Sequence, residues 1–320
     1  MTLVVDIVIA TCAQLPELDP DDHLLARMLE RLGMRVKPAV WTDPSVDWSG
    51  AAACIVRSTW DYHRHHEMFL RWIDDVQAKT YLLNPPGVIR WNAHKFYLRE
   101  LEKEGVPIVP TIWLARGAPV DLEAILNRSG WPEAVIKPAY GASADGILHV
   151  TSGRQARADG KLYVDRLLEH QDALLQPYLA TIAVHPERAL VFIDGVYSHA
   201  VKKMPFMHAQ SDLAMRALHP PGASGEIPVQ ATADEISLAS KALAAAPAGH
   251  IFARVDVVRH GVGLCVLEVE LIEPALYLYA HAPAARALAR SIVKQIASVN
   301  SRTVTRPSDG WRSGNPPPEC

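Results

Sequence analysis

A pair of apolar segments joined by a glycine turn constrains the fold of this chain more than any other feature. Residues 254–260 and 264–270 are rich in Val and Leu, and Gly261 and Gly263 mark a tight turn between them. Acidic residues interrupt both segments, although strands of this composition usually lie in a core. Because side chains alternate along a strand, a hairpin paired about Val262 would collect the acids on one face. The chain must therefore enclose one face of this hairpin and leave the other charged.

The charged face of this hairpin is a candidate metal site. The pairing predicts Asp256 opposite Glu268 and Arg254 opposite Glu270. The other face would point four apolar side chains into a core: Val255, Val257, Leu267 and Val269. Three carboxylates at this separation repel one another unless a cation lies between them, and Mg²⁺ binds carboxylate oxygens together with substrate phosphates. The alternative is a solvated face on which Arg254 balances the acids.

Length, charge and cysteine content indicate a cytoplasmic enzyme of several lobes. The 320 residues exceed one typical domain, and a net charge of −3 without a basic block argues against nucleic acid or a membrane surface as a partner. The cysteines lack metal-ligand spacing, which favours free thiols in a reducing compartment: Cys12, Cys54, Cys265 and Cys320. Residues 3–10 include Asp6 and lack a positive flank, so they predict a strand and not a signal peptide. No segment approaches the ~20 apolar residues that span a bilayer.

Residues 1–91 alternate strands and helices, which predicts an α/β lobe with a parallel sheet. The expected strands are residues 3–11, 35–41, 52–57 and 80–83, and the expected helices are residues 21–32 and 64–78. Functional loops should follow the carboxyl ends of the strands, at residues 11–14 and 57–61. Three histidines lie where the second helix begins, and a solvated helix end is favoured there over a metal site: His63, His65 and His66.

Two α+β lobes should follow, at residues 92–175 and 176–300. The expected helices are residues 92–103, 121–128, 163–170, 233–245 and 283–298. The expected strands, besides the acidic hairpin, are residues 108–114, 134–138, 147–150, 174–179, 189–193 and 196–201. Residues 205–228 lack periodicity and are a candidate mobile loop. The polar, proline-rich tail at 301–320 is predicted to be disordered.

Lys137 and the loop that follows it form a candidate phosphate site. Lys137 ends an apolar strand, and residues 139–146 contain Gly141, Ser143 and Gly146 among other small residues. Such a loop lets backbone N–H groups approach an anion. Separately, a strand-end lysine is more often paired or snorkelling, and a small-residue loop is more often an ordinary turn. Together with three carboxylates on another lobe, they predict a nucleoside triphosphate site, because polyphosphate needs positive donors and bridging cations.

From Asn92 to Pro274 the chain resembles the ATP-grasp carboxylate–amine ligases, which include glutathione synthetase, D-alanine–D-alanine ligase and RimK-like ligases. The resemblance implies a three-lobed fold in which a parallel-sheet lobe precedes two α+β lobes that clasp ATP. It implies ATP and Mg²⁺ as cofactors, with two ions expected and Mn²⁺ as a substitute. The implied ATP contacts are Lys95, Lys137, Tyr140, Gly141, Ser143, Gly146, Gln176, Pro177, Tyr178, Leu179, Glu187 and Lys202 or Lys203. The implied metal ligands are Asp256, Glu268 and Glu270.

One departure from the family concerns Glu270, because the third ligand there is most often an asparagine. Whether Glu270 holds metal or pairs with Arg254 stays open. Ligases of this family phosphorylate a carboxylate and let nitrogen attack the acyl phosphate, so arginines should hold the acceptor carboxylate. The candidate clamps are Arg57, Arg188 and Arg254. For each of these arginines taken alone, a surface or structural salt bridge is the alternative.

A narrower resemblance is to cyclo-ligases that act on O-ureido-serine, and residues 10–22, 56–62 and 268–275 carry it. It implies that ATP activates the carboxylate of O-ureido-D-serine and that the ureido nitrogen of the same molecule attacks it. The products would be D-cycloserine, carbon dioxide, ammonia, ADP and phosphate, in antibiotic biosynthesis. An internal nucleophile needs no second substrate pocket, but water must be excluded. The loops at 140–146 and 205–228 are the candidate lids.

Three functions are alternatives to a cyclo-ligase. An intermolecular amino-acid or peptide ligase would need two organic substrates instead of one. A nucleotide-binding module without catalysis is disfavoured by the intact set of lysines and carboxylates, and an interaction protein is disfavoured by a charged face. The implied partner is thus a small amino-acid-like molecule, and the oligomeric state is open, with a homodimer as the candidate.

Overall fold

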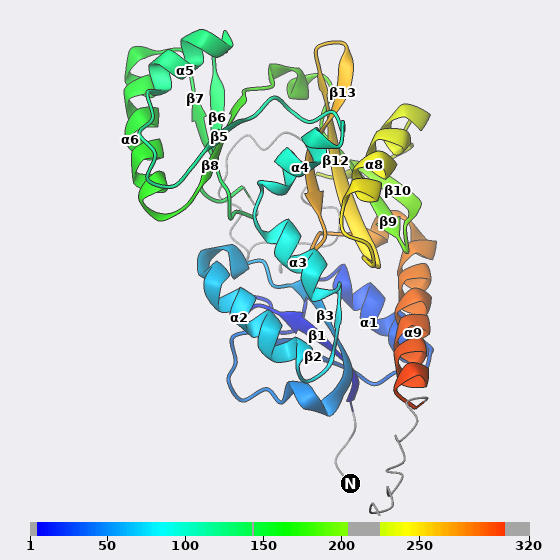
Figure 1. Ribbon diagram of the computed structural model, residues 1–320. Coiled ribbons are helices and arrows are strands. Elements are labelled where there is room, and N and C mark those ends of the chain that lie inside the picture. Colours follow the sequence, from blue (N-terminus) through cyan, green and yellow to red (C-terminus); the bar gives the residue numbers. More distant parts are fainter. Residues whose placement is uncertain (1–4, 143, 204–224, 305–320) are drawn as a thin grey trace, which may run out of the picture.

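The computed structural model describes residues 5–142, 144–203 and 225–304. Three β-sheets build three lobes, with the first lobe below the other two in Figure 1. This architecture confirms the expected combination of a parallel-sheet lobe with two α+β lobes. Over the described ranges, no helix is both long enough and apolar enough to cross a membrane.

The first lobe contains a four-stranded parallel sheet in the order β2-β1-β3-β4. Its strands are β1 (Val5–Thr11), β2 (Val36–Val40), β3 (Ala51–Ser58) and β4 (Tyr81–Leu83), and its helices are α1 (Asp22–Arg31) and α2 (His66–Gln77). Side chains alternate along β1, so Ile7 and Ile9 join a core with α1, whereas Val8 and Ala10 join a core with α2. Helices therefore cover both faces of the sheet, as the alternating sequence predicted.

The second lobe contains a four-stranded antiparallel sheet in the order β5-β8-β6-β7. Its elements are β5 (Ile112–Leu114), α5 (Leu122–Ser129), β6 (Ala134–Pro138), β7 (Leu148–Val150), α6 (Arg154–His170) and β8 (Ala173–Pro177). Helix α6 begins at Arg154, well before the predicted start near residue 163. The prediction omitted the first turns of α6 because they contain Gly160, and glycine disfavours a helix. A Cβ there would lie 2.8 Å from Val150, so the residue allows the helix to approach β7 closely.

The third lobe contains a five-stranded antiparallel sheet in the order β11-β10-β9-β12-β13. Its elements are β9 (Arg188–Ile193), β10 (Val196–Lys202), β11 (Ile227–Val229), α8 (Ala233–Ala245), β12 (Phe252–His260) and β13 (Gly263–Glu270). Helix α8 has the predicted bounds. Its start is fixed by a capping box, in which the Thr232 side chain accepts from the Glu235 N–H and the Glu235 side chain accepts from the Thr232 N–H.

The single helix expected at 92–103 is wrong, because the chain forms two short helices instead. Helix α3 (Pro86–Ala93) and helix α4 (Tyr97–Lys103) are separated at Lys95, whose N–H donates to the Ala139 carbonyl at 2.9 Å. The Asn92 amide accepts from the Leu271 N–H and donates to the Val269 carbonyl. The last turn of α3 and the segment that follows it therefore join the second lobe to the end of β13.

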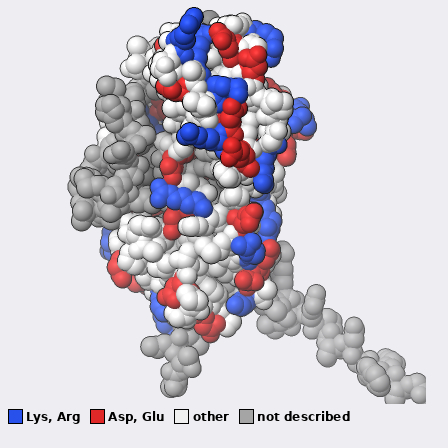
Figure 2. All heavy atoms as spheres, turned by 90° about the vertical axis from the view of Figure 1, so that its left-hand side faces the viewer, with Lys and Arg blue, Asp and Glu red and all other residues white. Residues whose placement is uncertain are grey.

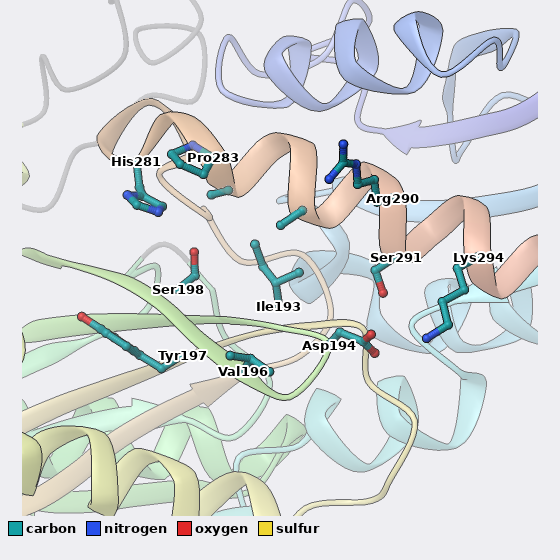
Figure 3. Close-up of a pocket in the computed structure, with 12 residues that line it drawn as sticks. Ile193, Asp194, Val196, Tyr197, Ser198, His281, Pro283, Arg290, Ser291 and Lys294 are labelled. Carbon is teal, nitrogen blue, oxygen red and sulfur yellow. The ribbon is translucent and has the colours of Figure 1, made fainter.

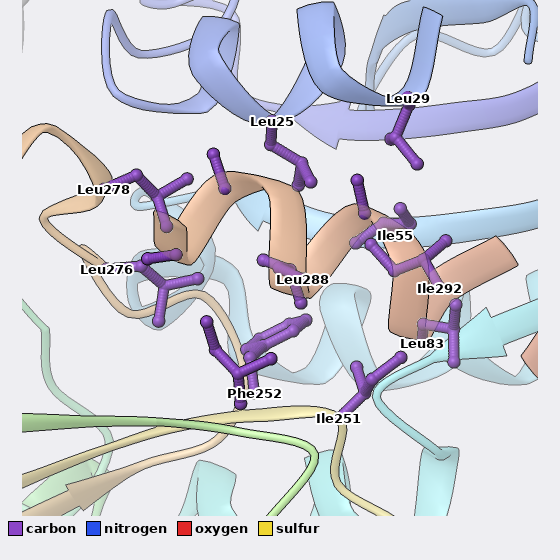
Figure 4. Close-up of a cluster of buried hydrophobic side chains, with 14 of the residues drawn as sticks. Leu25, Leu29, Ile55, Leu83, Ile251, Phe252, Leu276, Leu278, Leu288 and Ile292 are labelled. Carbon is purple, nitrogen blue, oxygen red and sulfur yellow. The ribbon is translucent and has the colours of Figure 1, made fainter. Parts of the chain in front are cut away.

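Helix α9 (Ala282–Val304) ties the first lobe to the third. The boundary proposed at 176–300 assigned this helix to the third lobe alone. Leu288 and Ile292 instead lie in one core with residues of α1 and β3 on one side and with Phe252 of β12 on the other. Figure 4 shows these side chains converging on the helix. The predicted start of a disordered tail at residue 301 is wrong, because residues 301–304 belong to this helix, and residues 305–320 lie outside the described residues.

Charged side chains of both signs share the surface. Figure 2 shows one face of the molecule, on which Lys and Arg lie interspersed with Asp and Glu. The three cysteines in the described ranges, Cys12, Cys54 and Cys265, are free thiols. These features agree with a small net charge and with a chain that needs no crosslink.

The bridging role of α9 predicts a large stability cost for Leu288→Ala. Leu288 is fully buried between two lobes, so the truncation should lower the free energy of unfolding by about 2–5 kcal/mol. Leu162→Ala on the exposed side of α6 is the control and should cost less than about 1 kcal/mol. Urea denaturation of both variants measures the difference, and equal costs would contradict this packing.

Candidate functional site

The hairpin of β12 and β13 carries the residues proposed as a metal site. Its register pairs Asp256 with Glu268 and Arg254 with Glu270, as predicted. The three carboxylates offer oxygens that lie within 4.8 Å of one another. A cluster of hard oxygen ligands on a rigid hairpin suits Mg²⁺, so the donor set fits that ion.

A register shift inside the hairpin determines which side chains share the charged face. The turn holds two residues, 261–262, so an uninterrupted register would set Asp256 opposite Leu267. The register instead shifts after Asp256, Val257 pairs with Val266, and Leu267 becomes an extra residue in β13. The expectation that Leu267 joins the core of the sheet is therefore wrong, because Val266 takes that position. Leu267 packs beside a small apolar cluster: Val109, Leu179 and Val258.

Basic side chains from separate segments neutralise the acidic face. Lys95, from the break between α3 and α4, forms an ion pair with Glu268. Lys203, which follows β10, places its Nζ 2.5 Å from an oxygen of Asp256. Arg254 donates to both oxygens of Asp256 at 2.9 Å and also pairs with the third carboxylate. The acids are thus held together by cations from the protein itself.

These ion pairs set the charge of the two central carboxylates. Burial alone would raise the pKa of Asp256, which is 1% exposed, but Arg254 and Lys203 hold that pKa below its usual value. Burial likewise opposes the ionisation of Glu268, and Lys95 outweighs it, so the pKa of Glu268 is also lowered. Both side chains are therefore ionised at neutral pH, as metal ligands must be.

Glu270 and Glu187 titrate differently from these two. Burial raises the pKa of Glu270, and repulsion from neighbouring carboxylates adds to the effect although Arg254 opposes it. Burial raises the pKa of Glu187 to about 7, against the attraction of Lys203 at 2.5 Å. Glu270 forms an ion pair with Arg254 in this structure.

Lys137 completes the charged cluster from the second lobe. It lies on β6, where burial lowers its pKa while the charge of Glu268 opposes that shift. The cluster then contains four basic side chains, Lys95, Lys137, Lys203 and Arg254, and four acidic ones, Glu187, Asp256, Glu268 and Glu270. The two sets balance in formal charge.

Arg188 and Lys202 do not join the acidic face. Arg188 pairs with Val257 in the sheet, so its side chain shares the face that α8 covers. There it bonds to Glu235 and to the Gln230 carbonyl. Lys202 lies opposite Arg188 on β10 and shares that face. The structure therefore corrects Arg188 as a substrate clamp, and of the two candidate lysines it brings only Lys203 to the acids.

The small-residue loop after β6 requires both of its described glycines. A Cβ at Gly141 would lie 3.0 Å from the Pro138 ring, and one at Gly146 would lie 3.2 Å from it. Gly146 also has a φ of +71°, which side chains disfavour. Ser143 lies outside the described residues, as do residues 205–224 of the second candidate lid at 205–228, whose last residues enter β11.

The same loop is fastened to the first lobe. Asp145 accepts hydrogen bonds from His63 Nε2 at 3.0 Å and Arg64 Nε at 2.9 Å. The ring of Tyr140 stacks on His66 with centroids 3.9 Å apart. The expectation of a solvated helix end is therefore wrong for His63 and His66, because the loop covers them.

The segment that follows β8 borders an apolar surface beside the acids. Gln176 is buried and its side-chain N–H donates to Thr111 Oγ1 at 2.9 Å, and Pro177 ends the strand. Tyr178 is half exposed and its ring stacks on His149. Leu179 packs with Val109 and Val258 of the small apolar cluster. A flat apolar ligand group could contact this surface while its polar end reaches the acids.

Arg57 extends from the carboxyl end of β3 into the junction of the first and third lobes. It is 2% exposed, and its Nε donates to Asp22 at 2.8 Å. Its Nη2 donates to the Pro274 carbonyl at 2.8 Å, and its Nη1 is buried without a hydrogen-bond partner. The structure thus gives Arg57 the structural salt bridge weighed as an alternative and leaves one N–H group available.

Sequence reasoning missed one buried acid near this junction. Glu273 follows β13 and is 7% exposed. Its backbone carbonyl accepts from Trp60 Nε1 at 3.0 Å. The sequence offers one signal for Glu273. It lies three residues after Glu270 and directly before Pro274, within residues 268–275, which carry the narrower resemblance.

A separate cavity of about 530 Å³ lies between the β9–β10 hairpin and α9. Figure 3 shows Arg290 and Lys294 of α9 on one side and Asp194 and Tyr197 on the other. It contains none of the proposed site residues. Its lining therefore has no part in the charged cluster.

Comparison with known proteins places the chain in a family. Residues 7–84 match the family described as D-cycloserine synthetase DcsG, N-terminal domain. The cycloserine biosynthesis protein DcsG of Streptomyces lavendulae is 32% identical over 274 residues, which cover 81% of this chain and 89% of that protein. The chain also resembles a crystal structure of the D-cycloserine synthetase DcsG, with a TM-score of 0.81 and 30% identity over 91% of this chain and 99% of that one.

More distant structures share the fold. An ATP-grasp RimK domain protein from Sphaerobacter thermophilus superposes with a TM-score of 0.65 at 15% identity, covering 89% of this chain and 98% of that one. The D-alanine–D-alanine ligase of Bacillus anthracis, complexed with ATP, gives 0.59 at 14% identity, covering 93% and 99%. The chain is therefore an ATP-grasp ligase and belongs to the family of the D-cycloserine synthetase DcsG.

Proposed function

We propose that this protein is an ATP-dependent cyclo-ligase that converts O-ureido-D-serine to D-cycloserine. The observation that carries the proposal is the cluster of three carboxylates that faces Lys95, Lys137 and Lys203 at the meeting point of the lobes. The similarity to the DcsG proteins supports the choice of substrate. The balanced reaction consumes O-ureido-D-serine, ATP and water and yields D-cycloserine, carbon dioxide, ammonia, ADP and phosphate.

The charge of the cluster suits ATP with two Mg²⁺ ions. ATP carries about four negative charges, which two divalent ions cancel, and the cluster itself has as many basic as acidic groups. Asp256, Glu268 and Glu270 would hold the ions, which supply positive charge to the transferred phosphoryl group. Lys95 and Lys137 would then contact phosphate oxygens, and the apolar cluster around Leu179 would face the adenine.

Arg254 and Arg57 are the side chains that could hold the carboxylate to be phosphorylated. Arg254 lies beside the proposed metal ligands, and Arg57 has a buried N–H group without a partner. A planar guanidinium orients a carboxylate through paired hydrogen bonds, which favours in-line attack on phosphorus. Arg188 is not included, because it lies on the opposite face of the sheet.

Cyclisation also requires that water stay away from the acyl phosphate. The loop of residues 140–146 is bound to the first lobe through Asp145 and Tyr140, and it follows β6 directly. This loop is positioned to cover the reacting groups while the internal nitrogen attacks. An internal nucleophile reacts with a large effective concentration, so a second amine pocket is unnecessary.

The cyclo-ligase and an intermolecular ligase differ in the number of organic substrates. With ATP and Mg²⁺, O-ureido-D-serine alone should release phosphate and give a product with the mass of cycloserine. The L-isomer and a panel of amino acids, singly and in pairs, serve as controls. Phosphate release that requires a pair of amino acids, or ADP formation at one background rate with every substrate, would contradict the proposal.

The proposed metal site predicts that Glu268→Gln lowers the turnover rate by at least about 10²-fold, because it removes one of the negative charges that hold Mg²⁺. The change keeps the shape of the side chain but leaves Lys95 without its ion-pair partner, so the variant should stay folded with a lower thermal unfolding temperature. Glu169→Gln at the exposed end of α6 is the matched control and should leave turnover unchanged. Phosphate release close to the wild-type rate in Glu268→Gln would show that the metal assignment is wrong.

A further inference from the structure

The segment after β13 is fastened to both sides of the junction between the first and third lobes. Arg57 of β3 donates to the Pro274 carbonyl, and Trp60 donates to the Glu273 carbonyl. Arg254 of β12 donates to the Ala275 carbonyl at 3.3 Å. Residues 273–275 therefore lie between the proposed metal site and the carboxyl edge of the first sheet, where the acceptor substrate of the proposed reaction must bind.

Among the described residues, Glu273 is an acid of this junction that forms no ion pair with a basic side chain. Its side chain is 7% exposed, and among the described residues no side chain donates a hydrogen bond to it; only its own backbone N–H does. The nearby arginines are engaged elsewhere, Arg57 with Asp22 and Arg254 with the acidic face. Burial, with repulsion from Glu270, raises the pKa of Glu273 to about 8, which is the response of a carboxylate without a bonded cation.

The other charged groups around the junction balance one another without Glu273. The eight charged groups of the cluster cancel, and Arg57 and Asp22 cancel each other at 2.8 Å. With a pKa of about 8, Glu273 is mostly protonated at neutral pH when nothing is bound, and among the described residues no cation is bonded to its carboxyl group. A buried carboxylate is costly unless a partner compensates it, and a bound ligand can be that partner.

We propose that the Glu273 carboxylate binds the α-ammonium group of the substrate and thereby makes the enzyme selective for zwitterionic α-amino acids. The assignment rests on the proposed ligase function. In an α-amino acid the ammonium and the carboxylate are attached to the same carbon, and Glu273 lies in the same junction as Arg57 and Arg254, whose charges act on it. The arginines would hold the substrate carboxylate next to the metal site while Glu273 holds its other end.

This arrangement acts on substrate position and not on the chemical step itself. With its ammonium bound to Glu273 and its carboxylate bound to the arginines, the substrate would point its side chain away from both contacts. The ureido nitrogen can then approach the activated carboxyl carbon only by folding back, which is the geometry of ring closure. Glu273 is in this sense a specificity-determining residue for the proposed reaction.

The contact between Glu273 and the substrate ammonium is tested by comparing the wild type and Glu273→Gln on two substrates. The substrates are O-ureido-D-serine and its analogue in which hydrogen replaces the α-amino group, 3-(ureidooxy)propanoate. Both keep the carboxylate and the ureido nitrogen, so phosphate release reports on both. The wild type should prefer the amino substrate in kcat/KM by about 10–100-fold, the range for a hydrogen bond to a charged group. Glu273→Gln should lose most of that preference while retaining turnover of the analogue.

Two further variants complete the test. Glu273→Asp keeps the charge and should restore part of the preference, which also covers the case in which the glutamine variant folds poorly. Glu235→Gln replaces another buried glutamate, which caps α8 away from the cluster, and should keep the wild-type preference. The thermal unfolding temperature is measured for each variant.

The outcomes are distinguishable. If Glu273→Gln lowers kcat/KM equally for both substrates and lowers the unfolding temperature, the acid is a structural counter-charge of Arg57 and the proposal is overturned. An unchanged preference for the amino substrate overturns it as well. A wild type that ignores O-ureido-D-serine but joins an amino acid to an amine refutes the cyclo-ligase function instead. The same comparison, run with that amino acid and its desamino acid, then decides the role of Glu273.

Discussion

The double hydrogen bond between Arg254 and Asp256 is the interaction on which the site depends. It places a buried cation within the acidic face, so three carboxylates can occupy one side of a hairpin without an ion from outside. Lys203 and Lys95 extend the pairing to neighbouring segments. Removing one partner of such a pair is costly, because the remaining charge stays buried. The cluster is thus a network whose members stabilise one another's charge states.

Side-chain amides tie this network to the rest of the molecule. Asn84, at the end of the first lobe, bonds to backbone groups of Phe252, Leu271 and Ile251. Asn92 bonds to the backbone at the end of β13. Because these amides satisfy buried backbone groups that lack strand partners, they fix where the acidic hairpin sits relative to the first lobe. The site is therefore formed by the junction of lobes and not by one lobe alone.

Local patterns in the sequence predicted the charged hairpin but not all of its neighbours. Alternation along two strands was enough to place the three acids on one face, since that pattern depends only on the pleat. The turn has two residues, however, and the predicted register holds because Leu267 forms a bulge. A bulge of this kind leaves no clear sequence signal, so the correct pairing and the wrong position of Leu267 arose together.

Residues whose role depends on distant contacts were the ones that sequence could not place. Arg188 was a reasonable clamp by position, but the sheet register turns it toward Glu235 of α8. Helix α9 shows a clear amphipathic pattern, yet nothing in that pattern says which lobe its apolar face will contact. His63 and His66 were expected in solvent because their partners, Asp145 and Tyr140, lie in a loop of another lobe.

The charge arrangement also separates two kinds of acid in the junction. Asp256 and Glu268 on the hairpin are held ionised by bonded cations, as the proposed metal ligands must be. Glu273 is buried, and among the described residues no cation is bonded to it, so its ionised form is stabilised when a ligand supplies a cation. Such an acid discriminates between substrates that supply an ammonium and those that do not, because only the former gain an ion pair with it. Selectivity for an amino acid can therefore arise from what the protein leaves uncompensated.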